Sequence, residues 1–199
     1  MKIVGLCGGS GSGKGSVSAI LSDLGYSVIN TDDIYHYLVS HDTDCLRDIR
    51  REFGDDVING GALDRRKLSA IVFSGIDAKE RLKTLNQITH HHVLCEVRDL
   101  TSKLYAEGKK IVFVDVPLLF ESGFNNECDV TVSVLADKEI RINRICERDG
   151  LDRTSANRRI ASQIPDDVLK NRTDYSILNN GSLSELNAQV KELIKIIDK

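Results

Sequence analysis

The residues with the clearest chemical pattern form a glycine-rich segment at positions 8–16, which reads GGSGSGKGS. Glycine lets the backbone curl so that successive N–H groups point at one anion, and the start of a following helix adds partial positive charge. Lys14 would supply a point charge to the outer phosphates. The segment predicts a nucleoside triphosphate site, with a structural glycine turn as the alternative. Its binding residues would be Gly9, Gly11, Ser12, Gly13, Lys14, Gly15 and Ser16.

One position in this segment departs from the usual pattern. A phosphate-binding loop of this kind has Ser or Thr directly after the lysine, where the hydroxyl holds magnesium. Gly15 stands there instead, and the first hydroxyl follows at Ser16. We expect the change to affect metal handling more than phosphate binding.

Three carboxylates are candidates for the transfer chemistry. Phosphoryl transfer to a hydroxyl needs a carboxylate that accepts the proton and aligns the oxygen, and ligands sit at the carboxyl edge of a parallel sheet. Asp32 and Asp33 follow the predicted strand at 27–30, and we assign Asp32 to chemistry and Asp33 to capping the next helix. Asp115, near the end of another strand, would act as a second base or order magnesium-bound water, or be a buried structural acid.

Six arginines lie within nineteen residues of the predicted helical section 138–172, with no lysine among them: Arg141, Arg144, Arg148, Arg153, Arg158 and Arg159. The first three recur at i, i+3 and i+7 and therefore share one helix face. Guanidinium groups match pairs of phosphate oxygens, so we interpret the cluster as phosphate-binding. The alternative is a solvated helix whose arginines pair with Glu139, Glu147 and Asp149.

An apolar segment, VPLLFESG at 116–123, would leave the sheet at this same edge. A hydrophobic loop in that place indicates a pocket wall for a large ligand, and internal packing is the competing interpretation.

Strands and helices alternate along most of the chain. Apolar runs predict strands at 3–7, 27–30, 111–116, 130–135 and 175–178, which indicates an α/β fold with a five-stranded parallel sheet. Residues 33–108 show no clear strand and are interpreted as helical throughout, with Asp64 capping a helix at 65–73 and a long helix at 78–107. In the last helix, 182–197, Ser182 and Glu185 have the spacing of a capping box.

The composition is that of an ordinary globular chain. It has 199 residues, 41% of them hydrophobic, and a net charge of −3. We therefore expect no nucleic-acid partner and no membrane span. The chain enters a strand at once, which leaves no room for a signal peptide, and five cysteines without metal or pairing spacing suggest reduced thiols. A cytoplasmic location is the simplest expectation.

The phosphate loop alone does not separate kinases, GTPases and motor ATPases. The guanine-reading pattern Asn-Lys-x-Asp is absent, and the third strand is followed by no Asp-x-x-Gly switch. The chain length is that of a small-molecule kinase.

Several segments, in order along the chain, resemble dephospho-coenzyme A kinase. They lie at 5–14, 28–32, 63–68, 88–90, 115–123, 144–150, 159–163 and 177–182, and DVPLLFESG at 115–123 is the most specific. The resemblance implies transfer of the ATP γ-phosphoryl group to the ribose 3′-hydroxyl of dephospho-coenzyme A, the last step of coenzyme A synthesis. It also implies a three-layer P-loop kinase fold in a single unit, 1–199. The core would take up about 1–32, 109–136 and 173–199, with a helical substrate-binding insert at about 33–108 and a lid at about 137–172.

The resemblance also assigns roles to residues. Asp32 matches the catalytic aspartate, Lys14 belongs to the ATP loop, and Arg144 and Arg148 match lid residues near the ATP phosphates. The turn near adenine matches Asn179 and Gly181. Substrate-side positions match Asp32, His90, Asp115, Leu118, Leu119 and Glu121.

The chain departs from the family pattern at four positions: Gly15, Asn30 in place of a carboxylate, His36 in place of an arginine, and His91 in place of a proline. With Gly15, Mg²⁺ would be held by phosphates, water and Ser16 or Asp115. Two other functions stay open: a kinase of another small hydroxyl acceptor such as a nucleoside, or an ATP-binding module that has lost catalysis.

Overall fold

The computed structural model describes residues 1–198, and the chain in it divides into two units. Unit 1 contains Met1–Ile29 and the residues that follow Lys103, and unit 2 is Asn30–Lys103. The predicted core segment 173–199 ends in Lys199, which lies outside the described residues. Most of the predicted insert, 33–108, falls in unit 2, and the whole lid region, 137–172, falls in unit 1.

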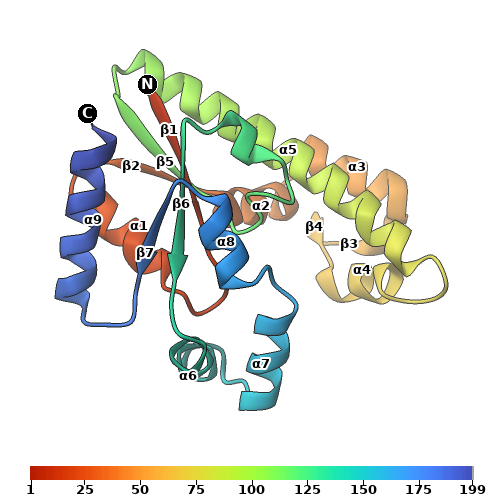
Figure 1. Ribbon diagram of the computed structural model, residues 1–199. Coiled ribbons are helices and arrows are strands. Elements are labelled where there is room, and N and C mark those ends of the chain that lie inside the picture. The colour runs from red at the N-terminus through yellow and green to blue at the C-terminus, as the bar shows by residue number, and fades with distance from the viewer. Residues whose placement is uncertain (199) are drawn as a thin grey trace. The chain divides into compact units, whose positions relative to one another are not determined.

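A five-stranded parallel sheet forms the centre of unit 1 (Figure 1). Its order is β2-β5-β1-β6-β7, and the strands are β1 (Lys2–Cys7), β2 (Ser27–Asn30), β5 (Ile111–Asp115), β6 (Val130–Leu135) and β7 (Tyr175–Leu178). Val4 of β1 aligns with Phe113 on one side and with Val130 on the other. The predicted strands and the α/β fold are confirmed, because runs of buried apolar residues are what a central parallel strand requires.

Two helices cover one face of this sheet, α1 (Lys14–Asp23) and α9 (Leu183–Ile197). Their apolar side chains join those of the strands in one buried cluster, which includes Val17, Leu21, Leu186, Val190, Val132 and Val134. The predicted capping box of α9 is confirmed, since Ser182 and Glu185 exchange both hydrogen bonds.

The alternate residues of β6 point to the opposite face. Ser133 is fully buried, and its hydroxyl lies 2.9 Å from that of Thr173, directly after α8 (Asp166–Arg172). Before α8 come α6 (Lys138–Asp149) and α7 (Arg153–Ala161), which pack through Ile142, Ile145 and Ala156. The predicted helical section 138–172 is therefore present as three helices. A short 3₁₀ turn, η2 (Phe124–Glu127), follows the apolar loop after β5.

Unit 2 is mainly helical, but one prediction about it is wrong. It contains α2 (Thr31–Ser40), α3 (Asp44–Phe53), η1 (Asp55–Val57), α4 (Arg65–Val72) and most of α5 (Ala78–Ala106). Between η1 and α4 a hairpin pairs β3 (Ile58–Asn59) with β4 (Ala62–Leu63), so residues 33–108 are not helical throughout. Gly60 and Gly61 both have positive φ, as a tight hairpin turn demands. Strands of two residues carry no hydrophobic alternation, and only the Asn59-Gly60-Gly61 signal could have revealed them.

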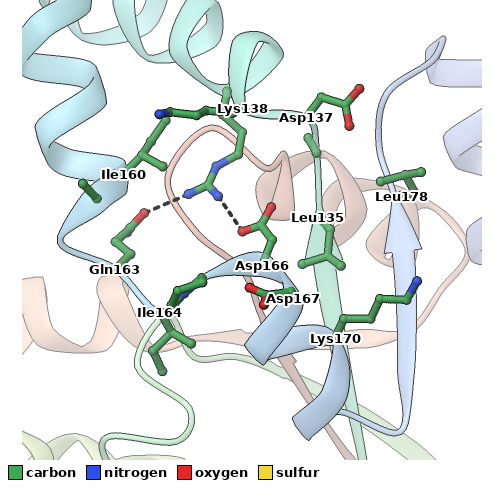
Figure 2. A pocket seen from close by; sticks show the side chains of 14 residues that line it. Leu135, Asp137, Lys138, Ile160, Gln163, Ile164, Asp166, Asp167, Lys170 and Leu178 are labelled. Atoms are coloured by element: carbon green, nitrogen blue, oxygen red, sulfur yellow. Dashed lines mark hydrogen bonds and ion pairs between the residues drawn. The ribbon is translucent and has the colours of Figure 1, made fainter.

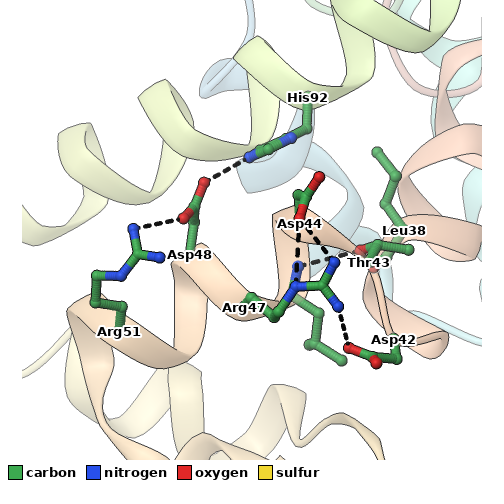
Figure 3. Close-up of polar contacts among 9 residues, drawn as sticks. Leu38, Asp42, Thr43, Asp44, Arg47, Asp48, Arg51 and His92 are labelled. Atoms are coloured by element: carbon green, nitrogen blue, oxygen red, sulfur yellow. Dashed lines mark hydrogen bonds and ion pairs between the residues drawn. The ribbon is translucent and has the colours of Figure 1, made fainter.

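Polar contacts fix α3 inside unit 2 (Figure 3). Asp48 of α3 accepts from Arg51 at 2.9 Å and lies 2.8 Å from Nε2 of His92 on α5. Thr43 caps α3 by accepting from the N–H of Leu46. The cap fixes the start of α3, and the contact between Asp48 and His92 holds α3 against α5.

None of the described helices combines the length and the apolarity needed to cross a lipid bilayer. All five cysteines are free thiols, and burial raises the pKa of Cys7 and of Cys128 to about 12.

Candidate active site

The glycine-rich segment at 8–16, called the phosphate loop below, connects β1 to α1. Gly11 and Gly13 lie in the left-handed region, with φ of 78° and 93°, which favours glycine. Gly13 is the N-cap of α1 and supplies no side-chain cap, so the first N–H groups of the helix are available to an anion. The buried Ser12 hydroxyl has no hydrogen-bond partner in the described part of the chain. Both observations fit the binding of phosphate oxygens.

Lys14, Ser18 and Asp115 come together beside this loop. Asp115 ends β5 and is buried. Its carboxylate lies 3.4 Å from Lys14 Nζ and accepts a hydrogen bond from Ser18 Oγ at 3.4 Å. Lys14 and Ser18 share a face of α1 because they are four residues apart. We did not predict Ser18 from the sequence, although its i+4 spacing from the lysine was a usable signal.

Packing does not require the glycine at position 15. A Cβ built on Gly15 meets no atom within 4 Å, and the backbone there does not have a positive φ. Ser16 is exposed in the first turn of α1. The hydroxyl found in hydrogen-bond contact with Asp115 is thus that of Ser18, and a serine at position 15 would be sterically free.

Two arginines of the predicted lid region, Arg141 and Arg144, contact the phosphate loop. Arg141 Nε donates to the carbonyl of Ser10 at 2.9 Å, and its side chain is 4% exposed. Arg144 Nη1 donates to the carbonyl of Gly11 at 3.3 Å. Its Nη2 donates to the carbonyl of Asn179 at 3.1 Å. The first two members of the predicted arginine face therefore reach the loop, although both contact its carbonyl oxygens.

Three other arginines of the predicted cluster form internal pairs of the kind that we considered as the alternative. Arg148 and Arg159 both pair with Asp149, and Arg153 pairs with Glu139. The hydrogen bond from Arg148 lowers the pKa of Asp149 to about 2. Binding of ATP phosphates by Arg148 therefore stays a prediction, and it would require Arg148 to exchange its partner.

The turn after β7 also contacts the phosphate loop. Asn179 is buried, and its Nδ2 donates to the carbonyl of Ser12 at 2.9 Å. A Cβ at Gly181 would lie 2.0 Å from Oε2 of Glu185. Gly181 is thus needed for the capping box of α9, and Asn179 is the residue of this turn that reaches the loop.

The apolar loop at 116–123 was interpreted either as a pocket wall or as internal packing, and different residues of it fit each interpretation. Leu119 is fully buried and packs on β1, where a Cβ at Gly5 would lie 3.0 Å from it. This is internal packing, but Leu119 also lines a small cavity beside Gly8 and Gly9, so its contact with a substrate stays a prediction. Leu118 is 45% exposed and Glu121 is exposed, so both are accessible to a ligand.

Asp32 lies at the start of α2, in unit 2. The prediction that the next residue, Asp33, caps this helix is wrong. The N-cap of α2 is Asn30, whose side-chain oxygen accepts from the N–H of Asp32 at 2.9 Å and of Asp33 at 3.4 Å. Asp33 is therefore not the cap. The helix begins three residues earlier than a cap at Asp33 would give, because the side-chain oxygen of Asn30 accepts from the first N–H groups as a carboxylate would. Asp32 is exposed in the first turn.

Unit 2 also contains His90, a predicted substrate contact, and His36, a departure from the family pattern. His90 is half-buried on α5. His36, at the position where the resemblance led us to expect an arginine, has its Nδ1 2.5 Å from Nη2 of Arg65. Arg65 also lies 5.6 Å from the centroid of the Tyr35 ring. A guanidinium group is thus present beside His36, supplied by a residue 29 positions away that sequence spacing did not single out.

Known proteins resemble this chain over nearly its whole length. The family model described as dephospho-CoA kinase matches residues 2–185. A dephospho-CoA kinase of Corynebacterium glutamicum is 36% identical over 96% of this chain and 94% of its own length. Among solved structures, a Thermus thermophilus protein has a TM-score of 0.80 and 33% identity, covering 98% of this chain and 96% of its own. A dephospho-CoA kinase from Campylobacter jejuni has a TM-score of 0.72 and 28% identity, covering 99% and 98%.

Proposed function

The chain belongs to the dephospho-CoA kinase family and is an enzyme of that activity, and from this premise we propose how its residues divide the work. The reaction transfers the γ-phosphoryl group of ATP to the ribose 3′-hydroxyl of dephospho-CoA, giving CoA and ADP. The observation that carries the proposal is the uncapped start of α1 after a glycine loop, with Lys14 and Asp115 beside it.

The phosphate loop and α1 bind the donor. The N–H groups at the start of α1, which no side chain caps, and the helix dipole bind the β- and γ-phosphates. Lys14 neutralises charge that develops on the γ-phosphoryl group, where preorganised charge is most effective. Arg144 and Arg148 add charge when the lid is closed, and Asn179 and Gly181 lie at the adenine.

Asp32 accepts the proton of the acceptor hydroxyl and aligns its oxygen for in-line attack. Two observations support this assignment: Asp32 is exposed, and it lies two residues beyond the end of β2. The carboxyl ends of parallel strands form the edge where ligands bind in such sheets. Its backbone is held by the amide of Asn30.

The groups present fit a magnesium ion that is bound mainly through the donor. No three His, Cys, Asp or Glu side chains in the described residues form a metal cage, and Mg²⁺ commonly keeps waters and binds to substrate phosphates with one or two carboxylates. Asp115 would supply the carboxylate, with a hydroxyl from Ser16 or Ser18. When bound, the ion neutralises phosphate charge.

Residues of the predicted substrate side are the proposed contacts of dephospho-CoA, and each unit is considered by itself. His90 is the proposed contact in unit 2, and Leu118 and Glu121 are the accessible contacts in the loop. The five free cysteines support the proposed cytoplasmic location, where thiols stay reduced.

An acceptor panel with labelled ATP and Mg²⁺ tests the substrate. We expect dephospho-CoA to be phosphorylated with a kcat/KM at least a hundredfold above that of any nucleoside. A nucleoside that reacts faster would replace the proposed acceptor. Binding of ATP without transfer to any acceptor, with Mg²⁺ or Mn²⁺, would instead favour a module that has lost catalysis.

A further inference from the structure

We propose that Arg141 and Gln163 are positioning residues that hold Ser10 of the phosphate loop, so that donor affinity depends on the lid segment between α7 and α8. The inference deepens the proposed function and rests on it only for the identity of the donor. Neither residue contacts the transferred group in this proposal; both act on the backbone that binds it.

Every polar atom of Ser10 is engaged by one of these two side chains. Arg141 Nε donates to its carbonyl oxygen at 2.9 Å. Gln163 Oε1 accepts from its N–H at 2.9 Å, and Gln163 Nε2 donates to its Oγ at 3.2 Å. Ser10 is separated from Gln163 by 153 residues, so these are contacts between the loop and the lid region.

Each of the three guanidinium nitrogens of Arg141 donates a hydrogen bond in this arrangement. Its Nη1 pairs with Asp166 at 2.5 Å and its Nη2 donates to Gln163 Oε1 at 3.0 Å, the two dashed contacts in Figure 2. They lie at one wall of a cavity of about 500 Å³. Because the arginine side chain is 4% exposed, these charge-assisted bonds are shielded from water and strong. Arg141 is consequently not a phosphate ligand in this conformation.

The glycines of the loop fit closely against the same arginine. A Cβ at Gly9 would lie 2.1 Å from Arg141 Nη2, and one at Gly11 would lie 2.6 Å from the carbonyl oxygen of Arg141. These two positions need glycine because α6 packs on the loop, in addition to any need of the ligand. The loop is thus held by hydrogen bonds at Ser10 and by close packing on either side of it.

A loop held in one conformation binds its anion with less loss of conformational entropy than a mobile loop does. Removing these contacts should therefore weaken donor binding specifically. A purely structural role would lower thermal stability and affect both substrates alike. The direct measurement is the Kd for ATP, obtained by calorimetric titration of the full chain without acceptor, so it does not depend on which acceptor is used.

The main variant is Arg141→Lys, which keeps the charge beside Asp166 but cannot donate to Ser10 and Gln163 at once. We expect the Kd for ATP to rise about tenfold, while the KM for dephospho-CoA stays within about twofold and kcat changes less than the KM for ATP. Arg153→Lys is the matched control, since Arg153 is an exposed lid arginine paired with Glu139. It should leave all three constants unchanged.

Gln163→Leu is the second variant and keeps the test valid if Arg141→Lys does not fold. It should weaken ATP binding by a similar factor, and the double variant should lose less than the product of the two factors because both act through Ser10. Unchanged ATP affinity in a folded variant, or equal losses for ATP and dephospho-CoA with a lowered melting temperature, would overturn the proposal. Failure to phosphorylate dephospho-CoA with normal ATP binding would overturn the proposed function alone.

Discussion

Two strands of this protein are each followed by a helix, β1 after the phosphate loop and β2 without a loop, and the two helix starts are built in opposite ways. Between β1 and α1 the N-cap is Gly13, which offers no side chain and leaves the first helical N–H groups open. Between β2 and α2 the N-cap is Asn30, whose amide occupies the N–H groups of Asp32 and Asp33. An open helix start binds an anion, whereas a capped one presents a fixed side chain.

The comparison explains why two strand–helix junctions have different proposed roles, one in binding ATP and the other in activating the acceptor hydroxyl. At the open junction the protein contributes backbone donors, and any added side chain would compete with the ligand. At the capped junction the Asn30 side chain already accepts from the first N–H groups, so the group available for chemistry is the carboxylate of Asp32. The two junctions should therefore respond differently to substitution.

The largest effect is expected at the capped junction, in Asp32→Asn. Loss of the base should lower kcat by about a thousandfold and leave the Kd for ATP within about twofold. Asp33→Asn is the matched control, because Asp33 lies in the same turn and shares the same cap. Steady-state kinetics with dephospho-CoA measure both. Near-normal turnover of Asp32→Asn, or equal losses in the two variants, would remove Asp32 from the role.

At the open junction, Gly13→Ala should abolish most donor binding. Its Cβ would lie 2.0 Å from Nδ2 of Asn179 at a φ of 93°, and we expect ATP affinity to fall about a hundredfold. Gly25→Ala is the control, since Gly25 has a φ of 88° but no atom within 4 Å of the added Cβ. That variant should lose stability from backbone strain and keep its ATP affinity. Normal ATP binding by Gly13→Ala would show that the open junction is not the donor site.

Asn30→Ala tests whether the cap matters for catalysis. Removing a side-chain cap costs about 1 kcal/mol, and we expect kcat to fall several-fold with an unchanged Kd for ATP, because Asp32 loses its fixed backbone. Asn30→Ser should restore most of the activity. Thr43→Ala removes the cap of α3 in the same unit and should destabilise similarly without changing kcat. If kcat falls equally in both capping variants, the effect is one of general stability.

The smallest effect is expected for Gly15→Ser, which adds a hydroxyl to the open junction where no atom obstructs it. Gly15→Ala separates the hydroxyl from helix propensity, since either replacement should stabilise the helix by about 0.5–1 kcal/mol. If Mg²⁺ is poorly held, serine should raise kcat about two- to fivefold, and alanine should not. Equal kcat in all three proteins would mean that Asp115 and the remaining hydroxyls suffice.

The five strands and the phosphate loop could be predicted because each depends on a local pattern of apolar residues or glycines. The cap of α2 was assigned to the wrong residue, since Asn30 and Asp33 both have suitable side chains and only the backbone decides between them. The β3–β4 hairpin is too short to show a period. The contacts of Ser18 with Asp115 and of Gln163 with Ser10 span 97 and 153 residues, and spacing says nothing about such pairs.

Cys7 ends β1 directly before the phosphate loop, is 1% exposed, and has a pKa that burial raises to about 12. At neutral pH it is therefore a protonated thiol that alkylating reagents reach only when the end of β1 opens. Its rate of alkylation is then a natural reporter of opening beside the donor site, read without any introduced probe. A bound donor that holds the loop closed would slow that reaction in proportion to its occupancy.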